Sequence, residues 1–194
     1  MWITIALLPV TYAIGMFPSA VIIARWRGVD IMKAGSGNPG ASNVIRVLGW
    51  RWGAMVMAAD FVKGTIAAAI GLGVGGRAGA YALGIGAVLG HTFPLLRKGG
   101  KGVAAAGGML VVLYPLVVLV LTVIWLFVSK VFKKASIASL AIIAVFPVAV
   151  AVGGYAGWEI AVISAISALL VVRHAGNIKR LVRHEENDLT PKAA

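Results

Sequence analysis

Long apolar runs constrain the fold of this chain more than any other feature of its sequence. A helix needs about 20 apolar residues to cross a lipid bilayer, and residues 103–129 form an uninterrupted run without a charged side chain. Further apolar stretches lie at residues 3–24, 52–74, 78–96, 137–152 and 160–172, with a short glycine-rich turn expected at 75–77. Hydrophobic residues make up 60% of the chain and charged residues only 12%, whereas about a quarter of a soluble domain is charged. The sequence therefore predicts an all-α polytopic membrane protein.

The run 103–129 decides the topology, because Pro115 lies near its middle and cannot continue a preceding helix without a kink. If the run is a single crossing, the chain has six spans. If it folds at Tyr114 and Pro115, the chain has seven spans, or five spans and a pair of helices that enters the bilayer and returns.

The basic residues distinguish these topologies, because short loops rich in Lys and Arg stay in the cytoplasm. A fold at Pro115 puts 16 of the 18 basic residues on the cytoplasmic side, Lys192 in the tail included, with Arg77 outside and Lys63 within a helix. A single crossing would divide them almost evenly. We therefore expect seven transmembrane helices, with the N-terminus outside and the C-terminus cytoplasmic. Residues 1–194 are expected to form one membrane-embedded domain with cytoplasmic loops at 25–51, 97–102 and 173–194.

The excess of basic residues gives the chain a formal net charge of +12. In a soluble protein this excess would indicate nucleic acid, but here the cytoplasmic loops and their attraction to anionic lipid headgroups account for it. We therefore expect membrane lipid and no nucleic acid among the partners. The chain has no cysteine, and its three histidines lack the spacing of paired zinc ligands, so no metal site is expected.

Three of the expected cytoplasmic loops are rich in glycine and small polar residues. They cover residues 35–46, 90–102 and 173–185. Residues 35–40 match G-x-G-x-x-G without the preceding strand that a dinucleotide site requires, and Gly102 after Lys101 breaks a P-loop motif. Glycines nevertheless let backbone N–H groups approach an anion. Any one loop is more simply a turn or an orientation signal, but the three together favour a shared phosphate site.

Two pairs of polar residues in or beside the spans have alternative interpretations. Asp60 and Lys63 lie three residues apart on one helix face; a structural ion pair is the simpler interpretation, although intramembrane charges are also functional candidates. Ser136 and Ser139 begin a later span and could cap and pack it, or present hydroxyl groups to phosphate. Gly86-x-x-x-Gly90 is expected to pack helices rather than bind a ligand.

The three loops together resemble the motifs of the bacterial acyl-phosphate:glycerol-3-phosphate acyltransferases. The matching residues are Ser36-Gly37-Asn38-x-Gly40-Ala41-x-Asn43 with Arg46, Gly90-His91-x-Phe93-Pro94 with Lys98-Gly99-Gly100-Lys101-Gly102-Val103-Ala104, and Arg173-His174-x-x-Asn177-Ile178-x-Arg180-Leu181. The resemblance covers nearly the whole chain. It departs from the family at Ala105, where threonine is common, and at His184-Glu185-Glu186, where a Gly-Thr-Glu-like stretch often follows, so the resemblance assigns no role to Glu185.

The resemblance implies a fold of seven membrane helices and a defined reaction. An acyl chain would pass from acyl phosphate to the 1-hydroxyl of glycerol 3-phosphate, giving lysophosphatidic acid and phosphate as the first step of bacterial phospholipid synthesis. It implies no cofactor, and it places a multi-pass enzyme in the cytoplasmic (inner) membrane with its active site facing the cytoplasm. The sequence is compatible with a monomer.

The resemblance also implies roles for individual residues. Those expected to hold glycerol 3-phosphate are Arg46, Lys101, Ser139, His174 and Asn177. Those expected to hold the acyl-phosphate head group are Ser36, Asn38, Asn43 and the amides of Gly99, Gly100 and Gly102, with Gly37 and Lys98 in the wider substrate-binding set. The catalytic residues would be His174, Asn177, Ser36 and Lys101. Either His174 or a phosphate oxygen of the donor could take the hydroxyl proton.

The alternative function is that of a non-enzymatic small-anion transporter or an anionic-lipid-binding membrane protein. A transporter usually places its site near the middle of the bilayer, whereas the polar motifs of this chain cluster at one expected face. A lipid-binding protein would need the basic residues but not the Ser, Asn and His residues that accompany them.

The charge distribution predicts the outcome of a topology experiment. Reporter domains fused after Lys134 and after Ala194 should both be cytoplasmic, because the fold at Pro115 returns the chain to the side that carries the basic loops. Protease accessibility or reporter activity in whole cells measures this. A reporter after Lys134 that lies on the outer side would contradict the fold at Pro115 and the shared phosphate site.

Overall fold

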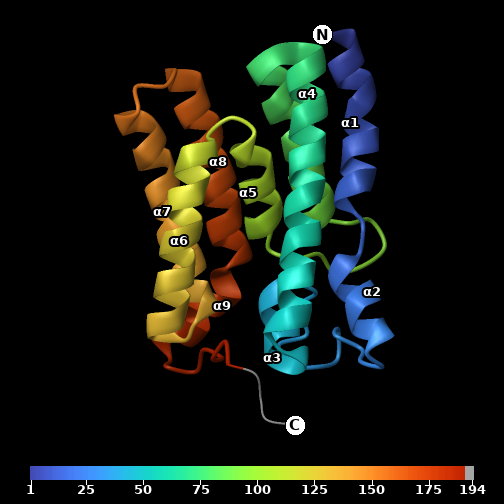
Figure 1. Cartoon of the computed structure of the whole chain (residues 1–194), viewed down its shortest axis with the longest axis vertical. Coiled ribbons are helices and arrows are strands. Elements are labelled where there is room, and N and C mark those ends of the chain that lie inside the picture. Colours follow the sequence, from blue (N-terminus) through green and yellow to red (C-terminus); the bar gives the residue numbers. More distant parts are fainter. Residues whose placement is uncertain (191–194) are drawn as a thin grey trace. The chain divides into compact units, whose positions relative to one another are not determined.

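The computed structural model describes residues 1–190, so Lys192, counted above among the cytoplasmic basic residues, lies outside the described residues. Every regular element within 1–190 is a helix (Figure 1). The helices are α1 (Trp2–Gly15), α2 (Ser19–Trp26), α3 (Ala41–Leu48), α4 (Trp50–Thr92), α5 (Val103–Val111), α6 (Pro115–Phe132), α7 (Ala135–Val152), α8 (Gly157–Arg173) and α9 (Ala175–Val182). They form two compact units, residues 1–115 with Thr190 and residues 116–189. The all-α prediction is confirmed, and the expectation of a single domain stays a prediction.

The first expected span is broken in the middle. Residues 3–24 were expected to form one helix, but α1 ends at Gly15 and α2 begins at Ser19. Pro18 accounts for the break, because it has no N–H to donate and disfavours a helical conformation at the residue before it. The carbonyl of Phe17 lies in the break, outside both helices, and accepts hydrogen bonds from the backbone N–H of Ser19 at 3.1 Å and from the Lys63 ammonium group at 3.3 Å.

The α4 helix contains the tight turn that the sequence predicts around residues 75–77. Gly75 and Gly76 have non-helical backbone angles, and Gly76 has a φ of 59°, a conformation that favours glycine. The chain reverses there and brings the two arms together: a Cβ on Gly71 would lie only 2.1 Å from the carbonyl oxygen of Gly79. The two arms of α4 therefore pack backbone against backbone.

Glycines let the other helices of the first unit approach α4 equally closely. A Cβ on Gly90 would lie 2.0 Å from the carbonyl oxygen of Tyr12 in α1, and a Cβ on Gly86 would lie 2.6 Å from the Thr11 hydroxyl. On the opposite arm, a Cβ on Gly64 would lie 2.0 Å from the carbonyl oxygen of Ala105 in α5. The interpretation of Gly86-x-x-x-Gly90 as a packing motif is confirmed, in keeping with the small residues that membrane helices use at their interfaces.

The long run 103–129 is interrupted where the sequence predicts a fold. α5 ends at Val111 and α6 begins at Pro115. With nine residues, α5 is about 14 Å long, about half the hydrocarbon thickness of a bilayer. Among residues 1–190, four helical segments are long and apolar enough to cross a membrane, with α1 and α2 counted together as Trp2–Trp26 and α4 counted once, or five if α8 and α9, which are bent by 58°, count as one span.

Candidate active site

The first glycine-rich loop is built around the buried side chain of Asn43. Its Oδ1 accepts a hydrogen bond from the backbone N–H of Ser36 at 2.8 Å, and its Nδ2 donates to the carbonyls of Ile31 at 3.3 Å and Ala34 at 2.9 Å. The amide thus holds the loop from both sides. Because both kinds of polar atom in Asn43 are engaged with the backbone, its observed contribution is to shape the loop, and its direct contact with a substrate stays a prediction.

The loop leads directly into the N-terminus of α3. Gly40 is the N-cap of α3 and accepts a hydrogen bond from the backbone N–H of Asn43 at 3.0 Å. The first amide groups of any helix lack a partner within the helix and favour an anion. Ser36 and Asn38 are half-buried in this loop, and Arg46 is half-buried in the last turn of α3. The arrangement can receive a negatively charged group.

The second glycine-rich loop lies directly against the end of α4. The backbone N–H of Gly100 donates to the carbonyl of His91 at 3.1 Å, and a Cβ on Gly99 would lie 2.2 Å from the carbonyl oxygen of Thr92. Both glycines are buried. Gly102, with a φ of 90°, is the N-cap of α5, so the loop ends at a second helix N-terminus. Lys101 beside it is half-buried, and Lys98 is exposed.

A cluster of buried polar side chains lies behind this loop, within the first unit. Asp60 Oδ1 is 2.8 Å from Lys63 Nζ and 3.5 Å from His91 Nδ1, and it accepts a hydrogen bond from the Ser19 hydroxyl at 2.6 Å. The expected ion pair of Asp60 and Lys63 is confirmed. The contacts of Asp60 with Ser19 and His91 were not predicted, because no spacing in the sequence links residues from three separate segments.

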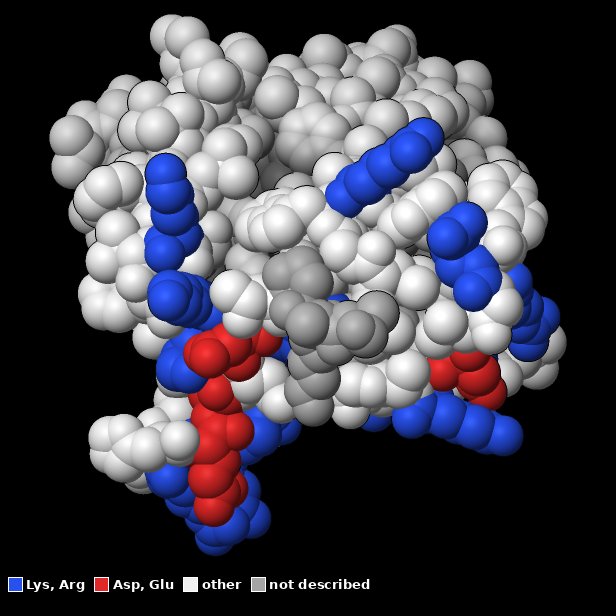
Figure 2. Space-filling model, turned by 60° about the horizontal axis from the view of Figure 1, so that its bottom comes forward, with Lys and Arg blue, Asp and Glu red and all other residues white. Residues whose placement is uncertain are grey.

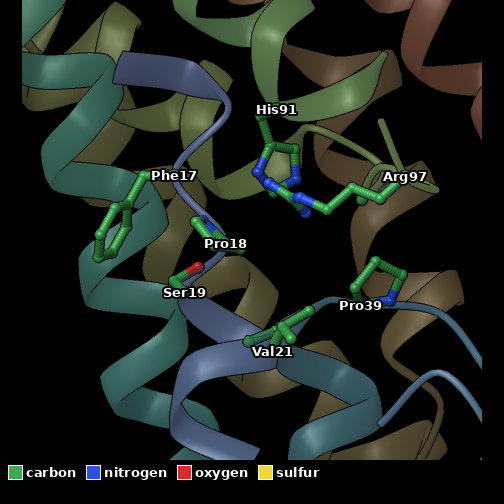
Figure 3. A pocket seen from close by; sticks show the side chains of 9 residues that line it. Phe17, Pro18, Ser19, Val21, Pro39, His91 and Arg97 are labelled. Carbon is green, nitrogen blue, oxygen red and sulfur yellow. The ribbon is translucent and has the colours of Figure 1, made fainter. Parts of the chain in front are cut away.

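The two glycine-rich loops meet at a small pocket in the first unit. Pro39 of the first loop and Gly100 of the second both line it, together with Ser19, His91 and Arg97 (Figure 3). The Arg97 guanidinium donates to the carbonyl of Met16 in the broken segment between α1 and α2. Burial lowers the pKa of Arg97 and Asp60 opposes that shift, but a guanidinium keeps its charge at neutral pH.

Figure 2 shows one face of the molecule, on which Lys and Arg side chains are abundant.

The third motif belongs to the second unit, where His174 lies at the bend between α8 and α9. The His174 side chain is buried, and its Nδ1 is 2.8 Å from the carbonyl oxygen of Leu170. A carbonyl can only accept, so Nδ1 carries the hydrogen and Nε2 of the neutral ring carries the lone pair. The hydrogen bond to Leu170 therefore makes Nδ1 the donor of this ring.

Asn177 and Arg180, both of α9, share one buried carboxylate. Asn177 Nδ2 donates to Glu186 Oε1 at 2.7 Å, and Arg180 Nε donates to Glu186 Oε2 at 2.8 Å. Glu186 is buried, whereas Glu185, to which the resemblance assigned no role, is exposed. No pattern in the sequence favours one glutamate over the other, because only the path of the chain after α9 brings Glu186 back to Asn177.

The hydroxyl groups of α7 differ in their surroundings. Ser139 is buried, and its Oγ accepts a hydrogen bond from the indole N–H of Trp125 at 3.1 Å. Ser136, one turn earlier, has a buried Oγ that makes no hydrogen bond with any described residue. The expectation that Ser136 caps the helix is therefore wrong, since α7 has no side-chain cap hydrogen bond. A buried polar atom without a partner is uncommon, and packing or a hydroxyl group that faces phosphate stay as its interpretations.

The contacts of Glu186 predict its effect on stability. Glu186→Ala removes the acceptor of the buried Asn177 amide group, which should lower the free energy of unfolding by about 1–3 kcal/mol. Thermal unfolding of the purified protein in detergent measures this. Glu185→Ala, at an exposed position, is the control and should leave the midpoint nearly unchanged; equal shifts in both variants would contradict the role given to Glu186.

Comparison with known proteins supports a single family across the chain. The family model described as glycerol-3-phosphate acyltransferase matches residues 5–184. Proteins named glycerol-3-phosphate acyltransferase from Sinorhizobium medicae (strain WSM419) and Bacillus velezensis (strain DSM 23117 / BGSC 10A6 / LMG 26770 / FZB42) are 39% and 34% identical, over 97% and 93% of this chain and 94% of each relative.

Solved structures agree with the sequence relatives. The crystal structure of PlsY (YgiH), described as an integral membrane glycerol 3-phosphate acyltransferase, in its glycerol 3-phosphate form superposes with a TM-score of 0.89 at 34% identity, over 95% of this chain and 94% of that one. Its lysophosphatidic acid form gives a TM-score of 0.87 over the same shares. The resemblance inferred from the three motifs is confirmed: this chain belongs to the glycerol-3-phosphate acyltransferase family.

Proposed function

We propose that this chain transfers an acyl chain from an acyl phosphate to the 1-hydroxyl of glycerol 3-phosphate, forming lysophosphatidic acid and inorganic phosphate. The observation that carries the proposal is the meeting of two glycine-rich loops at one pocket in the first unit, each loop ending at a helix N-terminus. Amide groups and ammonium groups in this arrangement suit a phosphate-bearing substrate. The relatives and the solved structures are named as glycerol-3-phosphate acyltransferases, and this identifies the acceptor that we propose.

The chemistry of an acyl phosphate limits what the protein must do. An acyl phosphate is a mixed anhydride, so the acyl carbon is already activated and no cofactor is required. The hydroxyl oxygen of glycerol 3-phosphate attacks the acyl carbon, the bond from that carbon to the bridging phosphate oxygen breaks, and the hydroxyl proton leaves to a base. The protein has to neutralise two phosphates, align the hydroxyl group and stabilise the developing oxyanion.

We assign the donor phosphate to residues of the first unit. The amides of Gly99 and Gly102 and the side chains of Ser36 and Asn38 would hold it, with Asn43 shaping the first loop and Lys98 and Gly37 in the wider set. The Gly100 N–H, also expected to bind this phosphate, donates to the His91 carbonyl instead, so Gly100 would place its neighbours. Lys101 would add a positive charge at the N-terminus of α5. Charge neutralisation by a fixed ammonium group and fixed amides costs little reorganisation when the leaving phosphate departs.

We assign the acceptor to Arg46, Lys101, Ser139, His174 and Asn177. The tautomer of His174 supports a role toward the acceptor hydroxyl, because Nε2 can accept a proton or a hydrogen bond. Asn177 Nδ2 donates to Glu186, and the side-chain carbonyl oxygen of Asn177 is suited to accept from a second hydroxyl group. A phosphate oxygen of the donor could also take the proton, and we favour this route because the donor is already activated.

We further propose the topology that the basic residues predict. Seven membrane helices, an outer N-terminus and a cytoplasmic C-terminus would put both glycine-rich loops at the cytoplasmic face of the inner membrane, where a water-soluble acceptor is available. The break at Pro115 supports this topology. A donor with a long acyl chain would enter from the surrounding lipid, and the chain would act as a monomer.

Removing the charge of Lys101 should show whether this residue binds substrate or only helps to set the orientation of the chain in the membrane. Lys101→Ala should raise the KM for glycerol 3-phosphate and lower kcat, because a half-buried ammonium group near phosphate is lost. Phosphate release from acyl phosphate and glycerol 3-phosphate in detergent measures both constants. Lys33→Ala is the control, since the Lys33 side chain is 87% exposed; equal behaviour of the two variants would make Lys101 a topology residue only.

Two substitutions at His174 distinguish the routes of the proton. If His174 is the general base, His174→Ala and His174→Asn should both lose on the order of 10²–10⁴ in kcat. If the donor phosphate takes the proton, His174→Asn should retain much of the rate, because an amide can still hydrogen-bond the acceptor. The measurement is kcat at saturating glycerol 3-phosphate. We expect the second pattern, and equal large losses would overturn it, while unchanged rates in both variants would remove His174 from the site.

A further inference from the structure

The buried cluster around Asp60 joins helix segments that are far apart in the sequence. Ser19 begins α2, Asp60 and Lys63 lie on the first arm of α4, and His91 lies at the end of the second arm. All three partners contact the same oxygen, Asp60 Oδ1. The side chains of Asp60 and Lys63 are only 3% and 6% exposed. A cluster of this kind costs desolvation energy inside a membrane protein, and such charges are functional candidates by default.

The ring of His91 connects this cluster to the second glycine-rich loop. A Cβ built on Gly100 would lie 2.1 Å from His91 Nε2, and its three nearest atoms would all belong to the His91 ring. The opposite ring nitrogen, Nδ1, faces Asp60. The imidazole therefore lies between the carboxylate and the backbone of Gly100, and it cannot turn away from Gly100 without leaving Asp60.

The backbone holds the same loop to the same residue. Gly100 N–H donates to the carbonyl of His91, so ring and carbonyl of one residue both fix the position of Gly100. The next residues of the loop are Lys101 and Gly102, which open α5. A shift of Gly100 would therefore move the amide and ammonium groups assigned above to phosphate.

We propose that Asp60 and His91 are positioning residues: Asp60 holds the His91 ring against Gly100 and thereby fixes the Lys98–Gly102 loop in its phosphate-binding conformation. The proposal deepens the proposed function and rests on it. Neither residue is assigned a contact with substrate. Because displacement of a binding group by about 1 Å can cost on the order of 100-fold in rate, a loop held by one buried ring is a sensitive point of the site.

A double-mutant cycle tests the contact between the ring and the loop. Gly100→Ala should lower kcat/KM roughly 10- to 100-fold, because the new methyl group pushes the loop away from a ring that is held in place. His91→Ala should also lower kcat/KM, since the loop loses its support. In the His91→Ala background the methyl group has room, so adding Gly100→Ala there should cost less than about threefold. An equal cost of Gly100→Ala in both backgrounds would overturn the proposal.

A control glycine separates this effect from a general intolerance of alanine. Gly107 lies in α5, and a Cβ there would make only an ordinary contact, 3.5 Å from Phe61. Gly107→Ala should therefore leave kcat/KM close to that of the wild type. A loss in Gly107→Ala as large as that in Gly100→Ala would remove the specific role of the ring.

Replacement of the ion pair tests Asp60 without leaving Lys63 as an unpaired buried charge. Asp60→Leu with Lys63→Met removes the acceptor for His91, whereas Asp60→Asn with Lys63→Met removes the same charges but keeps an oxygen at that place. Replacing a buried ion pair by apolar residues is often neutral for stability. We expect both pairs to fold, the Leu/Met pair to raise the KM for acyl phosphate roughly tenfold, and the Asn/Met pair to recover most of that loss. Wild-type kinetics in both pairs would show that the cluster is structural only.

Failure of this proposal differs from failure of the proposed function. If the wild type is active with acyl phosphate but the cycle shows no coupling, the proposed function stands and the positioning role falls. If the wild type is inactive with acyl phosphate, the proposed function falls, and the same cycle is measured on the binding of glycerol 3-phosphate by calorimetry. Coupling between positions 91 and 100 in that binding would support the positioning role, and additive effects would contradict it.

Discussion

The buried carboxylate of Asp60 is the interaction on which the first unit depends. An isolated charge cannot remain ionised in an apolar environment, so Asp60 must be surrounded by donors, and it draws them from α2 and from both arms of α4. Lys63, its nearest cation, also binds the carbonyl of Phe17 in the break between α1 and α2. The kink in the first span, the α4 hairpin and the position of the second glycine-rich loop therefore share one electrostatic centre.

The second unit solves a similar problem with a different carboxylate. Glu186 returns from the segment after α9 and receives the side-chain donors of Asn177 and Arg180, so the residues of the third motif are oriented by a group outside that motif. Both units thus place a buried acid behind the residues assigned to substrate. Each acid orients the side chains that donate to it. Asn177 Nδ2 is directed at Glu186, and the side-chain carbonyl oxygen of Asn177 is the atom that we assign to the substrate.

The sequence predicted the helical class, the turn at residues 75–77, the break at Pro115 and the Asp60–Lys63 pair, because local composition and spacing determine each of them. It did not predict the short length of α5 or the break at Pro18. The contacts of Ser19, His91 and Glu186 were also missed, since they join segments whose separation in the sequence has no fixed pattern. Asn43 was identified as important, but its observed contacts are with the backbone of its own loop.

The central claim is that the 1-hydroxyl of glycerol 3-phosphate accepts the acyl group of an acyl phosphate, its oxygen becoming the bridging oxygen of the new ester. The most direct measurement uses glycerol 3-phosphate labelled with ¹⁸O in its 1-hydroxyl group, incubated with purified wild-type protein and acyl phosphate, with mass spectrometry of both products. The account predicts lysophosphatidic acid that carries the label in the ester at position 1, and unlabelled inorganic phosphate. Label in the released phosphate, an ester at position 2, or no product with acyl phosphate would contradict it.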